Sequence, residues 1–169
     1  MKIADSSLTK SEEQCRLAAY PDNKGTPTIG WGSIYLNGRR VVLEDVITQE
    51  QADQMFETEA NEFDAQLNKI LGDTVLPQNK YDALWDFLFN EGEVHLMEST
   101  LLKKIKADPN DITIPNEFMK WIYSGGRVPV EGLIRRRGKE IALWLGVTLD
   151  EVATRWTALK EVMTKQHIA

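Results

Sequence analysis

The sequence has little of what disulfides, metal sites and membrane spans require. Its 169 residues include one cysteine, Cys15, and two isolated histidines, His95 and His167. A lone cysteine excludes an intramolecular disulfide, and histidines without a partner at ligand spacing argue against a metal site. We therefore expect neither a metal nor another cofactor. No stretch approaches the roughly 18 apolar residues of a membrane span, so stable membrane insertion is not expected.

The N-terminal sequence also lacks the apolar core of a secretory signal. Residues 1–7 read Met-Lys-Ile-Ala-Asp-Ser-Ser, which is too short in apolar residues for export. We expect the chain to fold in the cytoplasm, and to reach any target outside it through a pore that another protein makes.

Positive charge is scarce in the first part of the chain. The formal net charge is −6, and residues 1–75 hold 13 acidic against 7 basic residues, whereas residues 76–169 hold 13 of each. An acidic surface repels phosphate backbones, so nucleic acid is not an expected partner. Positive charge is concentrated locally in residues 135–137, three consecutive arginines that cannot all lie on one helix face. We expect one of them to face a substrate and the others to be solvated.

The first part of the sequence predicts a short helix and then strands. Residues 5–14 are expected to be helical, and residues 16–43 have the extended character of a small antiparallel sheet. Asn37-Gly38 is the strongest hairpin signal in that stretch. A capping box at Thr48 begins a long amphipathic helix over residues 48–71.

The rest of the sequence predicts helices, whose limits follow from proline, glycine and capping residues. These helices begin at Pro77, at Ser99 or Thr100, and at Pro115, and two more span Leu133–Leu145 and Thr148–Lys165. A small sheet followed by helices is an α+β architecture, which we expect to form a single domain over residues 1–169.

We expect this domain to have two lobes. A β-lobe is expected over about residues 14–47, and residues 48–71 are expected to connect it to a helical lobe made of residues 1–13 and 72–169. A polymeric substrate would lie in a cleft between two such lobes.

Glu13 and Asp22 are candidates for paired catalytic carboxyl groups. They lie at an expected helix end and in the turn after the first strand, an arrangement that can place both around one site. Hydrolysis of a glycosidic bond requires two carboxyl groups with different tasks. Thr28, on the next strand, has a hydroxyl that can orient a water beside Asp22. Composition alone makes this pair weakly specific, because 26 of the 169 residues are acidic.

A resemblance makes the constellation specific. The stretch Glu13–Asp22, followed by Thr28-Ile29-Gly30-Trp31-Gly32, resembles the active-site segment of phage-type lysozymes, glycoside hydrolase family 24. That segment has a Glu, eight residues, an Asp or Cys, five residues, a Thr, and then Ile-Gly-aromatic-Gly. Other family motifs are resembled, in family order, by Phe89-Asn90-Glu91-Gly92 with Ser99-Thr100-Leu101, by residues 121–126 (Trp-Ile-Tyr-Ser-Gly-Gly), and by residues 132–140 (Gly-Leu-Ile-Arg-Arg-Arg-Gly-Lys-Glu).

The resemblance implies a lysozyme-like fold and a muramidase that cleaves the β-1,4 bond between N-acetylmuramic acid and N-acetylglucosamine. It implies that Glu13 is the general acid and that Asp22 and Thr28 hold the attacking water, with inversion at the anomeric carbon. Trp31 is a candidate for stacking on a sugar. Arg136 is a candidate for a cation that contacts the substrate site and pairs with Glu13.

The chain departs from the family pattern at two positions. Ser33 stands where the family usually has a histidine after the second glycine, which removes an expected salt bridge but no catalytic group. Gln14 stands where a glycine commonly follows the catalytic glutamate, so the local backbone is expected to differ there.

The resemblance also implies a phage endolysin that acts, as a monomer, on bacterial peptidoglycan after release through a holin-type pore. Two alternatives remain open: a lytic transglycosylase, which needs only one acid/base glutamate, and a non-catalytic wall-binding protein on the same scaffold. The presence of Asp22 and Thr28 argues against the first, and the presence of Glu13 argues against the second.

Overall fold

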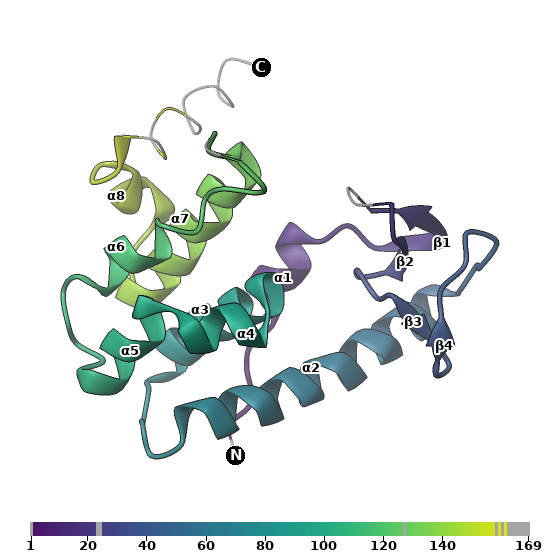
Figure 1. Ribbon diagram of the computed structural model, residues 1–169, viewed down its shortest axis with the longest axis horizontal. Helices are drawn as coiled ribbons and strands as arrows, with labels where there is room; N and C mark the ends of the chain where they lie inside the picture. The colour runs from purple at the N-terminus through teal and green to yellow at the C-terminus, as the bar shows by residue number, and fades with distance from the viewer. Residues whose placement is uncertain (1, 23–24, 127, 158, 160, 162–169) are drawn as a thin grey trace. The chain divides into compact units, whose positions relative to one another are not determined.

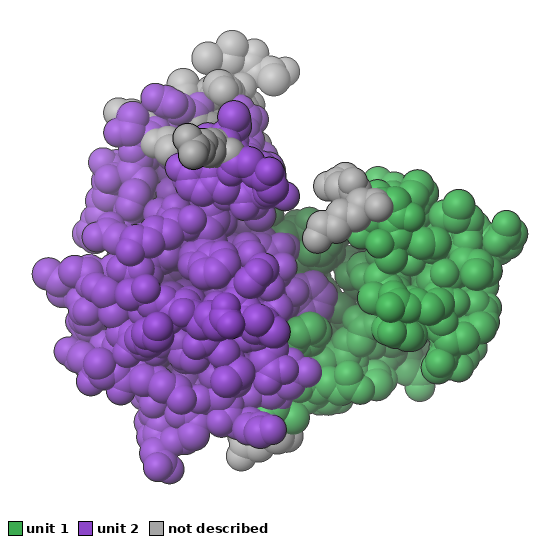
Figure 2. Space-filling model, viewed as in Figure 1, with its two compact units in different colours: residues 1, 3–65 green, residues 2, 66–169 purple. Residues whose placement is uncertain are grey.

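The computed structural model describes residues 2–22, 25–126, 128–157, 159 and 161. The chain divides into two compact units (Figure 2): residues 3–65 belong to the first, and Lys2 with residues 66–169 to the second. Figure 1 labels the helices and strands of both units. Over the described residues, no helix combines the length and the apolar character needed to cross a lipid bilayer.

The first unit contains a short helix, four short strands and most of a long helix. In chain order these are α1 (Ser7–Glu12), β1 (Arg16–Pro21), β2 (Pro27–Gly30), β3 (Tyr35–Leu36), β4 (Arg39–Arg40) and α2 (Gln49–Leu71), which continues into the second unit. The long helix predicted over residues 48–71 is confirmed. The first helix is shorter than the predicted range 5–14.

The single sheet predicted over residues 16–43 is instead two antiparallel pairs, β1–β2 and β3–β4. The chain reverses between them, and Ile29 and Ser33 exchange two backbone hydrogen bonds of 2.9 Å across this reversal. Gly30 and Gly32 have φ values of 64° and 106°, which side-chain-bearing residues rarely adopt. This tight reversal ends β2 before β3 can pair with it. The predicted hairpin turn 37–38 is confirmed, with φ values of 51° and 79°.

The pairing of β1 with β2 is interrupted by a bulge. Arg16 lies opposite Gly30 and Tyr20 lies opposite Thr28, so residues 17–19 of β1 face a single residue of β2. Such an insertion breaks the ladder locally and redirects the bulged strand.

The bulged part of β1 pairs with the segment that leads into α2. Ala19 N–H donates to the Asp45 carbonyl at 2.9 Å, and Ile47 N–H donates to the Leu17 carbonyl at 2.8 Å. One strand therefore binds two partners in turn, which ties the hairpin to the start of the long helix.

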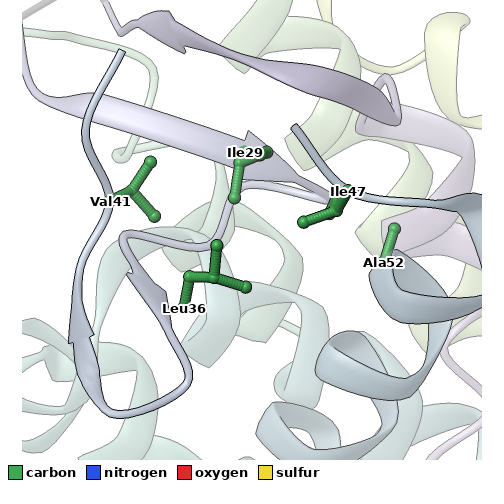
Figure 3. Packing of buried hydrophobic residues seen from close by; sticks show 5 residues of the cluster. All are labelled: Ile29, Leu36, Val41, Ile47 and Ala52. Atoms are coloured by element: carbon green, nitrogen blue, oxygen red, sulfur yellow. The ribbon is translucent and has the colours of Figure 1, made fainter. Parts of the chain in front are cut away.

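The hydrophobic core of the first unit lies between the strands and the first turn of α2 (Figure 3). It consists of Ile29, Leu36, Val41, Ile47 and Ala52, with Cys15, Ala19, Trp31 and Met55 packed against it. Full burial of a Val, Leu or Ile side chain contributes about 1.5–3 kcal/mol, so even this small cluster holds the strands in place.

The second unit is helical. Beyond the end of α2 its helices are α3 (Gln78–Glu91), α4 (Glu93–Glu98), α5 (Thr100–Ala107), α6 (Ile114–Phe118), α7 (Glu131–Leu145) and α8 (Leu149–Ala153). Several predicted helix ends are confirmed. Pro77 precedes α3, the Ser99 hydroxyl caps α5 by accepting from Leu102 N–H at 3.0 Å, and Gly146 ends α7 in the left-handed conformation.

Two features of these helices differ from the prediction. The sequence did not indicate α4, which begins after Gly92, where φ is 87°. The last helix was predicted over 148–165, and its capping box of Thr148 with Glu151 is present, but α8 ends at Ala153. Residues 154–156 are not helical, and the described residues 157, 159 and 161 are helical again. Residues 158, 160 and 162–165 of that prediction, and His167, lie outside the described residues.

Aromatic side chains form the centre of the second unit. The ring of Phe87 meets the rings of Phe118 and Trp121 edge-on at centroid distances of 5.7 and 5.4 Å, and Phe118 contacts Trp144 at 5.7 Å. Edge-to-face pairs at such distances add to the stability gained from burial. They join α3 to α6 and α7.

Candidate active site

Glu13 is placed by the end of the first helix. It is the C-cap residue of α1, and its N–H donates to the Thr9 carbonyl at 3.0 Å while its own backbone is already extended (φ −92°, ψ 139°). Its side chain is half-buried. The change from helix to extended chain at this residue leads into β1 three residues later.

Asp22 is held by the turn that joins β1 to β2. Its N–H donates to the Thr26 carbonyl at 2.9 Å, and its Oδ1 accepts from Thr26 N–H at 2.7 Å. Gly25 closes the turn from the other side, with its N–H donating to the Asp22 carbonyl at 2.9 Å. A carboxylate that accepts a backbone N–H is held in one orientation.

Thr28 shares a face of the β1–β2 pair with Tyr20. The two residues are directly opposite, and directly opposite residues in antiparallel strands share a face. The Thr28 hydroxyl donates to the Thr26 carbonyl at 3.0 Å, and the side chain is only 4% exposed. Because its hydrogen is committed to that carbonyl, the oxygen is left to accept a hydrogen bond, for instance from a water.

Tyr20 was not predicted as a site residue, yet its hydroxyl lies within the electrostatic reach of both proposed carboxyl groups. Burial raises the pKa of Tyr20; the Arg16 guanidinium opposes this, and the negative charges of Glu13 and Asp22 raise the pKa further. The Arg16 guanidinium stacks on the Tyr20 ring at 4.3 Å. The charges of Glu13 and Asp22 therefore both act on the Tyr20 hydroxyl. The signal in the sequence was the position of Tyr20 two residues before Asp22 on one strand.

Trp31 is fixed in position by α2. Its indole Nε1 donates to Asp53 Oδ1 at 2.8 Å, its ring meets Phe56 at 6.1 Å, and the Lys10 ammonium lies over it at 5.6 Å. The pKa of Asp53 is lowered by the hydrogen bonds from Trp31 and then Gln49, with a smaller effect of the Lys10 charge. The ring is half-buried, so part of its surface is free for contact with a ligand.

An open groove of about 550 Å³ runs along α2 beside Asp53 and is lined by Gln49, Glu50, Asp53, Gln54 and Glu57. Its lining is polar and mostly acidic. The carboxylate that orients Trp31 thus also borders this groove.

Ser33, at the position of the usual family histidine, is buried and bonds to α2. Its hydroxyl forms a hydrogen bond with Glu59, and burial raises the pKa of Glu59 while this hydrogen bond lowers it. This hydrogen bond ties the reversal after β2 to α2.

Arg136 lies in the second unit, on α7, and is 5% exposed. Its Nε and Nη2 donate to the two carboxylate oxygens of Asp86 at 2.9 and 3.0 Å. This fork fixes the guanidinium of the residue that we expected to face the substrate.

The prediction that the other arginines of the run are solvated is wrong for Arg137, which is fully buried. Its Nη1 donates to Glu91 at 2.6 Å, and its Nη2 donates to Asn90 at 2.8 Å and to Glu140 at 2.5 Å. The acceptors come largely from α3, more than 40 residues away in sequence, so the pattern on α7 alone could not indicate them.

Across the described residues, no group of three His, Cys, Asp or Glu is placed to hold a metal ion.

Comparison with known proteins identifies the family. The phage lysozyme family model matches residues 10–140. The endolysin of Acyrthosiphon pisum secondary endosymbiont phage 1 is 38% identical over 140 residues, covering 81% of this chain and 92% of that protein. The endolysin of Bacillus phage B103 is 35% identical over 167 residues, 96% of this chain, but the match spans only 60% of that longer protein.

The fold is shared with solved structures of the same family. An endolysin from Escherichia coli O157:H7 phage FAHEc1 superposes with a TM-score of 0.74 at 32% identity, covering 86% of this chain and 94% of that one. The predicted α+β, lysozyme-like fold is thereby confirmed. The chain belongs to the phage lysozyme family and is a peptidoglycan-hydrolysing glycosidase of the lysozyme type.

Proposed function

We propose that this enzyme cleaves the β-1,4 bond between N-acetylmuramic acid and N-acetylglucosamine with inversion, using Glu13 as general acid and Asp22 with Thr28 to hold the attacking water. One observation supports this above others: the register of the strands puts Thr28 opposite Tyr20, two residues before Asp22, and the charges of Glu13 and Asp22 both raise the pKa of Tyr20.

In the proposed reaction the Glu13 carboxyl gives its proton to the glycosidic oxygen as the bond to the anomeric carbon breaks. A water, held by Asp22 and the Thr28 oxygen, attacks that carbon from the opposite face and loses a proton to the Asp22 carboxylate. Exchange with solvent then returns both carboxyl groups to their starting states. Inverting glycosidases hold their carboxyl groups about 6.5–9.5 Å apart to leave room for the water.

Two further residues are proposed to contact the substrate. Trp31 offers a half-buried ring whose orientation is set by Asp53, which suits stacking on a sugar face. Arg136 offers a guanidinium fixed by Asp86, which suits an anionic or carbonyl group, or the Glu13 carboxyl itself.

We further propose that residues 1–169 act as a single catalytic domain. Its β-lobe is residues 14–47, its helical lobe is residues 1–13 together with 72–169, and residues 48–71 are the connecting helix. The enzyme is proposed to be made in the host cytoplasm as a monomer, to bind no nucleic acid, to insert stably in no membrane, and to reach the wall after a holin opens the way. Its proposed physiological task is lysis of the host cell.

The Glu13→Gln variant tests the catalytic assignment. Loss of the transferable proton is expected to lower the rate of wall hydrolysis by about 10²–10⁴-fold without loss of folding. Glu44→Gln makes the same chemical change at an exposed residue of the first unit and is expected to retain full activity. If Glu13→Gln lyses walls as fast as the wild type, the assignment is wrong.

The products test the mechanism. NMR of freshly cleaved glycan is expected to show the α-anomer at the new reducing end, since a β bond is broken with inversion. Retained β configuration would contradict the role of Asp22 and Thr28. Detection of 1,6-anhydro products by mass spectrometry would identify a transglycosylase instead.

A further inference from the structure

The contact between α3 and α7 contains a buried cluster of charged groups. Asp86 and Arg136 form one ion pair, and Arg137 binds Glu140 and Glu91, as described above. Glu140 and Arg137 are fully buried and Asp86 is 1% exposed. Charged groups in such a position are tolerated only when their charges and hydrogen-bonding atoms are matched.

One atom of this cluster lacks a donor. Glu140 Oε1 accepts from Arg137 at 2.5 Å, but no N–H or O–H of the described residues donates to its buried Oε2. The neighbouring carboxyl is that of Asp86, because Arg136, which holds Asp86, lies one helical turn before Glu140 on α7. Two carboxylates repel and have only acceptor atoms, so a contact between them is a hydrogen bond only when one of them carries a proton.

The position of the proton follows from the other partners. Both oxygens of Asp86 accept from the Arg136 fork, which favours the ionised form of Asp86. Glu140 accepts one hydrogen bond from a guanidinium, that of Arg137, and its other oxygen has no donor. Glu140 is therefore the group that holds the proton, and Asp86 is the group that accepts from it.

We propose that Glu140 is protonated in the folded enzyme and donates a hydrogen bond to Asp86, which makes it a positioning residue for the carboxylate that orients Arg136. This inference does not depend on the proposed catalytic roles. A protonated Glu140 adds a donor to Asp86 without adding a second buried negative charge, so it steadies the Asp86–Arg136 fork.

The electrostatics of the surrounding groups agree with this. Burial raises the pKa of Glu140 well above its usual value; the Arg137 charge opposes this, the charge and the hydrogen bond of Asp86 raise the pKa further, and Arg136 opposes it. Helices α6 and α8 also pack on α7, but in the part of the chain that the structure describes they add no charged group to those acting on Glu140.

The effect on stability has a defined sign. The folded state holds a proton on Glu140 that the unfolded chain releases above the ordinary carboxyl pKa, so stability falls as pH rises. The contribution is complete below the unfolded-state pKa and is lost as the pH rises through the raised pKa of the folded state. A group that is ionised when folded would give the opposite slope.

Three variants and a spectrum test the proposal. In Glu140→Gln the amide NH2 can donate to Asp86 and the amide oxygen can accept from Arg137, so it reproduces the protonated acid. Glu140→Met fills similar space with neither group. We expect the melting temperature of the Gln variant to lie within a few degrees of that of the wild type. At neutral pH its stability is expected to lose the pH dependence that comes from the one proton held by Glu140. The Met variant is expected to unfold at a clearly lower temperature.

Glu98→Gln, at an exposed residue of α4, is the matched control and is expected to keep the wild-type pH dependence. In the wild type, the infrared carbonyl band of a protonated carboxyl is expected to persist at neutral pH, and the difference spectrum against Glu140→Gln is expected to show the loss of one such carboxyl. The proposal is overturned if the wild type lacks that band, or if the Gln variant is as unstable as the Met variant, since loss of an ionised Glu140 would then be the cause. Absence of the band from the wild type overturns the proposal even where a variant fails to fold.

Discussion

The side chains of Tyr20 and Thr28 lie directly opposite each other on one face of the β1–β2 pair. Asp22 follows two residues later, in the turn after β1, and its carboxylate is held by the backbone N–H of Thr26. The opposite face of β2 carries Ile29, which is fully buried in the core of the first unit. The alternation of a strand thus separates the residues that hold the unit together from those that we propose to act on the glycan.

Substitution of Thr28 separates the hydroxyl from the volume of its side chain. Thr28→Val keeps the shape but removes the oxygen that is proposed to accept from the water, and it leaves the Thr26 carbonyl without its 3.0 Å donor. We expect a loss of roughly 10²-fold in kcat and a cost to stability of about 1 kcal/mol. Thr28→Ser, which keeps the oxygen, is expected to retain most of the activity. Full activity of Thr28→Val in a wall-lysis assay would remove Thr28 from the mechanism.

The hydrogen bond from Trp31 to Asp53 predicts a change in titration. It is the largest cause of the lowered pKa of Asp53, so Trp31→Phe is expected to raise this pKa toward its ordinary value, while Gln49 and Lys10 still hold it partly down. A carboxyl group whose pKa is lowered in the folded state stabilises the fold at pH values above its ordinary pKa, and this stabilisation is lost as the pH falls. The stability of the variant is therefore expected to be less sensitive to acid.

NMR titration of the Asp53 carboxyl is the measurement for this prediction. Asp111, whose pKa is lowered mainly by Thr113 in the second unit, serves as internal control and is expected not to change. An unchanged Asp53 pKa in Trp31→Phe would show that the indole hydrogen bond has no such effect.

Two glycines of α7 predict opposite responses to alanine. At Gly132 an added Cβ meets open space, so Gly132→Ala is expected to stabilise the enzyme by a few tenths to about 1 kcal/mol through a better helix propensity. At Gly138 the Cβ would lie 2.6 Å from Leu159 Cδ2 and 3.1 Å from Leu149 Cδ1. Gly138→Ala is expected to cost about 1–2 kcal/mol through overpacking. Urea unfolding of both variants checks the pair; a stabilised Gly138→Ala would contradict the close packing.

Salt is expected to increase lysis before it decreases it. The net charge of −6 and the anionic cell wall repel each other at low ionic strength, and added salt screens this repulsion. The initial rate of wall clearing is therefore expected to pass through a maximum above the lowest salt concentration. Replacement of the exposed residues Glu93 and Glu98 by lysine should move that maximum to lower salt. A rate that falls steadily from the lowest concentration would refute the prediction.

Local signals in the sequence predicted much of the fold. The turn at Asn37-Gly38, the proline before α3 and the capping box at Thr148 act over a few residues, so their meaning does not depend on the rest of the chain. The spacing from Glu13 to Trp31 carried the family resemblance, and the comparisons confirm the family.

Long-range contacts could not be predicted in the same way. The division of the expected sheet into two pairs depends on the reversal after Gly30 and on the bond of Ile47 to Leu17, across 30 residues. Burial of Arg137 and Glu140 depends on Asn90 and Asp86, which lie on another helix. A pattern that looks like a solvated charge run on α7 becomes an interior network only when α3 packs against it.

The bulge in β1 has a consequence for how the hairpin can fail. If β1 shifted by one residue along β2, each side chain of the strand would move to the other face of the pair. Asp22 would then be displaced and aliphatic side chains would leave the core, so catalytic activity and stability would be lost together. Anchoring of the bulged residues by a second chain segment makes that slip break two sets of bonds at once. Variants that loosen the loop before α2 should therefore impair hydrolysis without touching any group that meets the sugar.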